Sequence, residues 1–86
     1  MFTDEQITTM FDRQVHRRLN ALGIDQRELA RRVGISEVSL SRYLNGRRDP
    51  GLSLIIRMAE ALECEPSFLV DIYGSTRLYK EDEYCV

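Results

Sequence analysis

Apolar residues recur along the chain at the three- and four-residue spacing that places them on one face of a helix. The pattern predicts five helices, which with their capping residues span about 3–22, 25–34, 36–45, 52–62 and 66–74. The apolar stripe of the first helix comprises Ile7, Met10, Phe11, Val15, Leu19 and Leu22. The inward positions of the last two are Leu54, Ile55, Met58, Ala59, Leu62, Phe68, Leu69 and Ile72. The chain is therefore predicted to be an all-α domain.

Residues that cap helix ends support these boundaries. Thr3 with Gln6, and Asp25 with Glu28, have the spacing of a capping box. In that motif the cap side chain accepts an amide hydrogen of the first turn, and the residue three positions later reaches back. Gly34 follows the second helix, where the left-handed backbone of a helix end costs glycine little.

Residues 26–45, QRELARRVGISEVSLSRYLN, form the most informative segment, in which a glycine turn joins two short helices. Ala30 is small enough to let the two helices cross closely. The second helix, capped by Ser36, has a predicted buried stripe of Leu40, Tyr43 and Leu44. Its predicted outward stripe is Glu37, Val38, Ser41, Arg42 and Asn45. This geometry is typical of a helix-turn-helix, whose second helix enters the major groove of DNA, although plain helical bundles contain similar helix pairs.

Several spaced features together resemble the helix-turn-helix of the phage-repressor/Cro-like family, also called the xenobiotic-response-element-like family. The matching residues are Gln26, Leu29-Ala30, Val33-Gly34-Ile35-Ser36, Leu40, Tyr43-Leu44-Asn45-Gly46, Pro50, and segments 52–62 and 66–72. The resemblance covers residues 13–73. It implies a compact five-helix, lambda-repressor-like DNA-binding domain over residues 1–74, with a C-terminal tail at 75–86. The chain departs from the family at Glu65, where family members usually place a Ser or Asn cap before the proline.

The resemblance also implies roles for single residues toward double-stranded DNA. Gln26 would bond a phosphate, and Glu37 and Val38 would point at base edges from the start of the recognition helix. With Ser41 and Arg42, these two make up the predicted base contacts. The remaining predicted phosphate contacts are Asn45, Arg47 and Arg48, of which Arg48 has the minor groove as an alternative.

Glu37 and Arg42 each leave two interpretations open. Family members often carry Gln or another neutral residue at position 37, and a glutamate repels phosphate. Glu37 therefore indicates either a cytosine in the site, whose N4 donates to a carboxylate, or a pairing with Arg42 or Gln26. Val38 would suit a thymine methyl. Arg42 suits a bidentate contact to guanine, and its alternative is a phosphate contact or an ion pair with Glu37.

Charge is distributed unevenly along the chain, which hides a basic region behind a formal net charge of −2. Residues 11–58 hold ten arginines against five acidic residues, a local charge of +5. Residues 59–86 carry −5. A DNA-binding face responds to the local field, because more distant charges are screened by salt. Most arginines outside the motif's exit are expected on solvated faces, with Arg13 or Arg17 as outer phosphate contacts; the others are Arg18, Arg31 and Arg32.

The two ends of the chain extend beyond what the motif requires. Phe2, Ile7 and Met10 either pack on the C-terminal helix or form a dimer contact. The tail, STRLYKEDEYCV, has no helical period and is either disordered or an arm that packs on a second subunit. Its candidate dimer residues are Leu78, Tyr79, Tyr84 and Val86.

Composition favours few other chemistries. No nucleophile–base pair, phosphate loop or metal-ligand spacing stands out, so we expect no enzyme activity, catalytic residue, metal or cofactor. Cys64 is predicted to be a small core residue, Cys85 to be free and His16 to lie on the surface. No apolar run is long enough for a membrane span, and the N-terminus lacks the regions of a secretory signal. These features favour a cytoplasmic, nucleoid-associated protein without membrane contact.

Two functional hypotheses follow. The first is a sequence-specific transcription regulator, most simply a repressor that binds a palindromic operator as a homodimer. The second is an antitoxin or other protein-interaction module that uses the same fold and captures a protein partner through the C-terminal tail.

Overall fold

The computed structural model describes residues 2–70, which form five α-helices and no strand. The helices are α1 (Asp4–Leu22), α2 (Gln26–Val33), α3 (Glu37–Leu44), α4 (Gly51–Ala61) and α5 (Pro66–Leu69). The all-α prediction and the five-helix count are confirmed within this range. Ile72, Gly74, Cys85 and the tail 75–86 with its candidate dimer residues lie outside the described residues.

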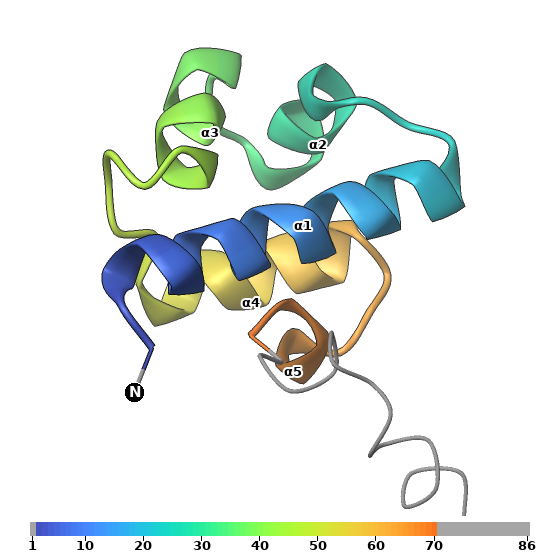
Figure 1. The fold of residues 1–86 in the computed structure, drawn as a ribbon. Coiled ribbons are helices and arrows are strands. Elements are labelled where there is room, and N and C mark those ends of the chain that lie inside the picture. The colour runs from blue at the N-terminus through green and yellow to red at the C-terminus, as the bar shows by residue number, and fades with distance from the viewer. Residues whose placement is uncertain (1, 71–86) are drawn as a thin grey trace, which may run out of the picture.

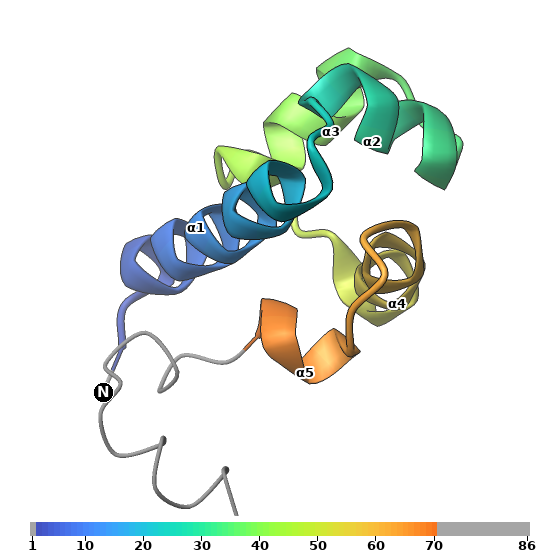
Figure 2. The ribbon, with the colours of Figure 1, turned by 90° about the vertical axis from the view of Figure 1, so that its right-hand side faces the viewer.

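The long α1 runs through the middle of the molecule (Figure 1). The pair α2 and α3 lies on one side of it, at the top of both views, and α5 lies at the opposite end (Figures 1 and 2). Helix α4 packs against α2 and α5, while α1 contacts α3 and α5. The helix-turn-helix is therefore held from below by α1 and α4.

Local capping explains where the first three helices begin. Thr3 and Gln6 form both halves of the predicted capping box, with N–O distances of 3.1 and 2.9 Å. Asp25 accepts the Glu28 amide at 2.9 Å, as predicted. The reciprocal half of that second box is absent, because the Glu28 carboxylate bonds Arg31 and Arg32 instead.

One buried cluster drawn from all five helices forms the core: Phe11, Val15, Leu19, Leu29, Ala30, Val33, Leu40, Leu44, Leu54, Met58, Ala59, Leu62 and Leu69. Tyr43, Ile55 and Phe68, predicted to be inward, are half-buried and pack against it. Cys64 is also half-buried beside the core, and this burial raises the pKa of its thiol. Burial of this apolar surface is the main source of stability for a helical domain of this size.

The predicted stripe of α1 is only partly correct. Ile7 is 46% exposed, and Leu22 is half-buried. Gln14, which the apolar pattern omits, is buried at 3% exposure. Its Nε2 donates to the carbonyl of Phe68 at 3.0 Å and so ties α1 to α5. Since this contact lies in the middle of α1, the first turns of the helix are left with an open flank.

The N-terminal flank of α1 borders a largely apolar groove. Ile7 and Met10 line it together with Leu69 and Val70, beside the end of α5. Ile7 and Met10 therefore lie beside the C-terminal helix, which agrees with the first of the two interpretations. Within residues 2–70, however, that helix does not cover them completely.

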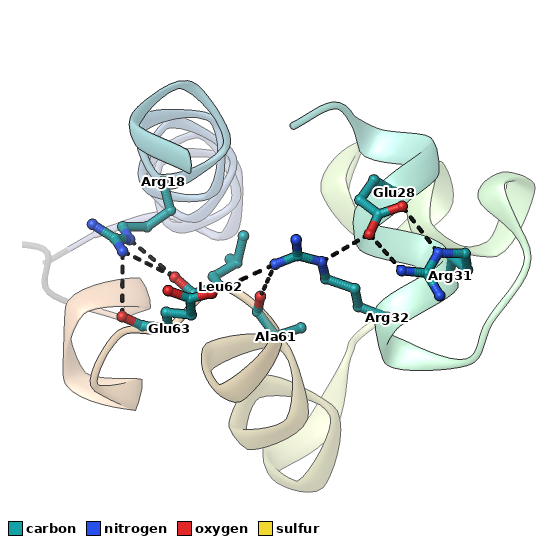
Figure 3. A network of polar contacts seen from close by, with 7 residues as sticks. All are labelled: Arg18, Glu28, Arg31, Arg32, Ala61, Leu62 and Glu63. Carbon is teal, nitrogen blue, oxygen red and sulfur yellow. Dashed lines mark hydrogen bonds and ion pairs between the residues drawn. The ribbon is translucent and has the colours of Figure 1, made fainter. Parts of the chain in front are cut away.

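Two arginines expected on solvated faces close the C-terminal end of α4, although Arg32 remains exposed as expected. Arg18 is half-buried and donates from Nε and Nη2 to the carbonyl of Leu62, at 3.1 Å each, and to that of Glu63 at 3.2 Å (Figure 3). Arg32 donates to the carbonyl of Ala61 at 3.1 Å. The C-terminal end of a helix leaves carbonyls unpaired and carries a partial negative charge, so cationic donors stabilise it.

Candidate nucleic-acid interface

Helix α3 presents one face to the core and the other to solvent. Its start is fixed by Ser36, whose Oγ accepts the amide of Ser39 at 3.0 Å. Leu40 and Leu44 are almost fully buried and anchor the inner face. The helix therefore cannot rotate about its axis without exposing both leucines, and its outer side chains keep a fixed direction.

Three of the four predicted base-contacting residues are exposed on α3, and the fourth is half-buried. Glu37 and Arg42 are exposed, and Ser41 is half-buried. Val38 is 61% exposed, which is a large apolar exposure for so short a helix. An apolar side chain exposed to water at this point can make an apolar contact with a methyl group of a ligand.

Arg42 differs from most other arginines of the motif region in having an unused guanidinium. Within residues 2–70 its side chain makes no hydrogen bond and no ion pair, whereas its main-chain carbonyl accepts the amides of Arg47 at 2.9 Å and Arg48 at 3.3 Å. The backbone of the turn after α3 is thus tied to Arg42 while the side chain stays free to bind.

Glu37 has an ion-pair partner that the sequence did not indicate. Its Oε1 lies 3.9 Å from Nε of Arg27, the second residue of α2. The partners considered from the sequence, Arg42 and Gln26, do not pair with it. Residues 27 and 37 are distant in the helical pattern, and only the crossing of α2 with α3 brings them together.

The predicted phosphate-contacting residues lie at two ends of the motif. Gln26 is half-buried at the first position of α2, next to the free amides of that helix start. Asn45, Arg47 and Arg48 are exposed after the end of α3. The guanidinium of Arg48 stacks over the ring of Tyr43, 5.3 Å from its centroid, which restrains that side chain on the surface.

The turn after α3 is fitted closely to α1. Gly46 has a left-handed φ of 77°, and a Cβ placed there would lie 2.9 Å from Cγ2 of Thr8. Such a close approach requires glycine. The segment that follows α3, with its arginines, is therefore positioned by the first turns of α1.

A polar pocket lies between α1 and the starts of α2 and α3. It is lined by His16, Leu19, Asn20, Ile24, Asp25, Gln26, Arg27 and Glu37. Among the described residues, Arg27 is the arginine that lines this pocket. His16 and Asn20 belong to the exposed side of α1, where their spacing of four residues could have indicated a shared polar face.

Other classes of site find no support in the part of the chain described. No three acidic, histidine or cysteine side chains gather within residues 2–70 as metal ligands would. None of the helices described combines the length and the hydropathy that crossing a membrane requires.

Comparison with known proteins assigns the chain to a family. A family model described as helix-turn-helix matches residues 15–69, which is more than half of the chain and contains α2 through α5. Comparisons with curated proteins and with solved structures gave no match. The chain belongs to the phage-repressor/Cro-like helix-turn-helix family, a family of DNA-binding transcription regulators.

Proposed function

We propose that this protein is a sequence-specific repressor that binds a palindromic operator in double-stranded DNA as a homodimer. The observation that carries the proposal is the outer face of α3, on which Val38 is 61% exposed and Arg42 has no partner within residues 2–70. Side chains held in this way on a rigid helix are suited to bind the edges of bases in the major groove.

Base recognition is divided among four side chains in this proposal. Arg42 bonds O6 and N7 of a guanine, and Val38 contacts a thymine methyl. Glu37 accepts a hydrogen bond from N4 of a cytosine. Ser41 bonds a base or a phosphate from the same face.

Phosphate contacts position the helix in the groove. Gln26 and the start of α2 bind the backbone on one side, and Asn45, Arg47 and Arg48 bind it on the other. Stacking on Tyr43 holds Arg48 partly ordered before DNA arrives, so less side-chain entropy is lost on binding.

The small size of the module supports the homodimer. One α3 of eight residues reaches few base pairs, whereas two subunits would contact half-sites about 34 Å apart. A dimer seated on a promoter would act by occlusion. In a bacterial cell, a protein bound to chromosomal DNA in this way would work in the cytoplasm, at the nucleoid.

Selection of bound duplexes from a random DNA pool tests the proposal. We expect an inverted repeat whose half-sites contain a guanine and are separated by about one helical turn. The logarithm of the association constant for the selected operator, measured by fluorescence anisotropy, should fall linearly with the logarithm of salt concentration. Equal affinity for all duplexes, or no binding at low salt, would contradict it.

A protein-interaction module is the second candidate, favoured by the apolar groove beside α5. Ile7 and Val70 line that groove and are 46% and 53% exposed. Such a module would bind its partner tightly and random DNA only weakly, so the same selection experiment separates the two functions.

A further inference from the structure

A carboxylate on a DNA-binding face presents an electrostatic problem. Glu37 is the first residue of α3 and is exposed, so it would approach the negatively charged backbone as the helix enters the groove. Its charge therefore needs a compensating cation that remains close to it in the complex.

Arg27 stands where such a cation is needed. Its Nε is 3.9 Å from Oε1 of Glu37, and the two side chains are 82% and 55% exposed. An exposed pair of this length contributes little to the stability of the free protein. Its exposure also means that the guanidinium is not used by the fold.

The surroundings of the pair favour a third, anionic member. Arg27 follows Gln26 at the start of α2, and both line the polar pocket together with Glu37. The other acidic residue of that pocket, Asp25, already accepts the amide of Glu28. A guanidinium has five donors in a planar fork, so it can bond a carboxylate with one edge and a phosphate with another.

We propose that Arg27 is a specificity-determining residue that bridges Glu37 and the DNA phosphate beside Gln26. The inference rests on the proposed function and deepens it. Arg27 holds the carboxylate toward α2 at a fixed angle to the bases, and it cancels the repulsion between that carboxylate and the backbone. Glu37 then accepts from cytosine N4, which it would not do if it were driven away from the groove.

A double-mutant cycle tests the inference on the full chain and the operator selected with it. The four proteins are the wild type, Arg27→Ala, Glu37→Gln and the double variant. We expect Arg27→Ala to weaken operator binding about tenfold or more in the wild-type background, because an unpaired carboxylate is left facing DNA. In the Glu37→Gln background the loss should be several times smaller, since only a phosphate contact is removed.

Base preference supplies a second measurement, because the loss of a simple phosphate contact would leave it unchanged. Selection with Arg27→Ala should lose the cytosine preference at the position contacted by Glu37, as selection with Glu37→Gln does. Arg57→Ala, on the exposed side of α4 and without a side-chain partner in residues 2–70, removes the same charge and is the matched control. It should leave the preference intact.

The outcomes are distinguishable. Equal losses in both backgrounds, or an unchanged cytosine preference in Arg27→Ala, would overturn the role of Arg27 while leaving a wild type that selects an operator. A wild type that selects no sequence would contradict the proposed function itself, and the role of Arg27 with it. Circular dichroism of each variant verifies that the helices are retained.

Discussion

The side chain of Arg42 on α3 is exposed, and its hydrogen-bond donors have no partner within residues 2–70. We expect Arg42→Ala to reduce discrimination at one base pair of the operator by about 1–3 kcal/mol, while binding to unrelated DNA changes little. Selection and anisotropy on matched and mismatched duplexes measure the two quantities separately.

Arg42→Lys is the control for charge alone. Lysine keeps the charge but lacks the planar fork, so the variant should lose base preference almost as far as alanine does. If Arg42→Ala instead lowered affinity for all duplexes by the same factor, and Arg42→Lys restored it, Arg42 would be a phosphate contact.

Glu28 makes the stability of the fold sensitive to acid. Hydrogen bonds from Arg31 at 2.6 Å and Arg32 at 3.0 Å lower the pKa of its carboxyl from 4.5 to about 2. A pKa lowered by folding contributes stability above the unfolded value, and this is lost as the pH falls through the folded value. Glu28→Gln should therefore be less stable than the wild type at about pH 6, with the difference vanishing near pH 2.

Urea midpoints of the two proteins across this pH range check the prediction. Glu60→Gln is the control, because the side chain of Glu60 makes no hydrogen bond or ion pair within residues 2–70. A difference in stability between Glu28→Gln and wild type that stays constant with pH would show that the hydrogen bonds from Arg31 and Arg32 do not stabilise the ionised carboxylate.

At this scale, the residues that cap helix starts could be predicted and interactions between helices could not. Thr3, Asp25 and Ser36 cap their helices as their sequence spacing indicates, because a cap depends only on the next three residues. The pairing of Glu37 with Arg27 depends on the crossing of α2 and α3, which no local pattern contains.

Among the elements, the turn after α3 approaches α1 closely at Gly46. Gly46→Ala would combine a left-handed backbone with a clash against Thr8. We expect it to reduce the free energy of unfolding by about 1–3 kcal/mol more than Gly23→Ala does. Gly23 is the matched control, since it has a similar φ of 71° but no described atom near its Cβ position.

A second substitution separates the cost of the clash from the cost of the left-handed backbone. Thr8→Ala in the Gly46→Ala background removes the side chain that a new Cβ would meet. It should restore stability to about the level of Gly23→Ala, as measured by urea unfolding. Equal costs for Gly46→Ala and Gly23→Ala would show that α1 can move away from the turn.

The elements show the same division between local and tertiary information. The buried faces of α3 and α4 follow from the apolar period, which predicted Leu40, Leu44, Leu54 and Met58 correctly. Gln14 was missed because the apolar pattern has no place for a polar residue that satisfies a carbonyl of another helix. The bonds from Arg18 and Arg32 to carbonyls at the end of α4 were missed for the same reason.

At the scale of the whole molecule, charge separates a basic centre from an acidic end. Residues 11–58 carry +5 and residues 59–86 carry −5. Electrostatic attraction by DNA should orient the protein with the basic helix-turn-helix toward the duplex. The acidic residues 59–86 are repelled by the duplex, so a contact between subunits through them would not compete with DNA; this connects the charge pattern to the proposed dimer.

Truncation after Gly74 tests that connection. The deleted residues 75–86 carry a net charge of −1, so their removal alone should slightly strengthen binding to a polyanion. If the tail holds two subunits together, the truncated protein should instead have half the mass in sedimentation. It should also bind a two-site operator at least about tenfold more weakly, because the second half-site no longer benefits from linkage. Leu78→Ser in the full chain keeps every charge and should act in the same direction, whereas an unchanged mass together with unchanged affinity would show that residues 75–86 take no part in assembly.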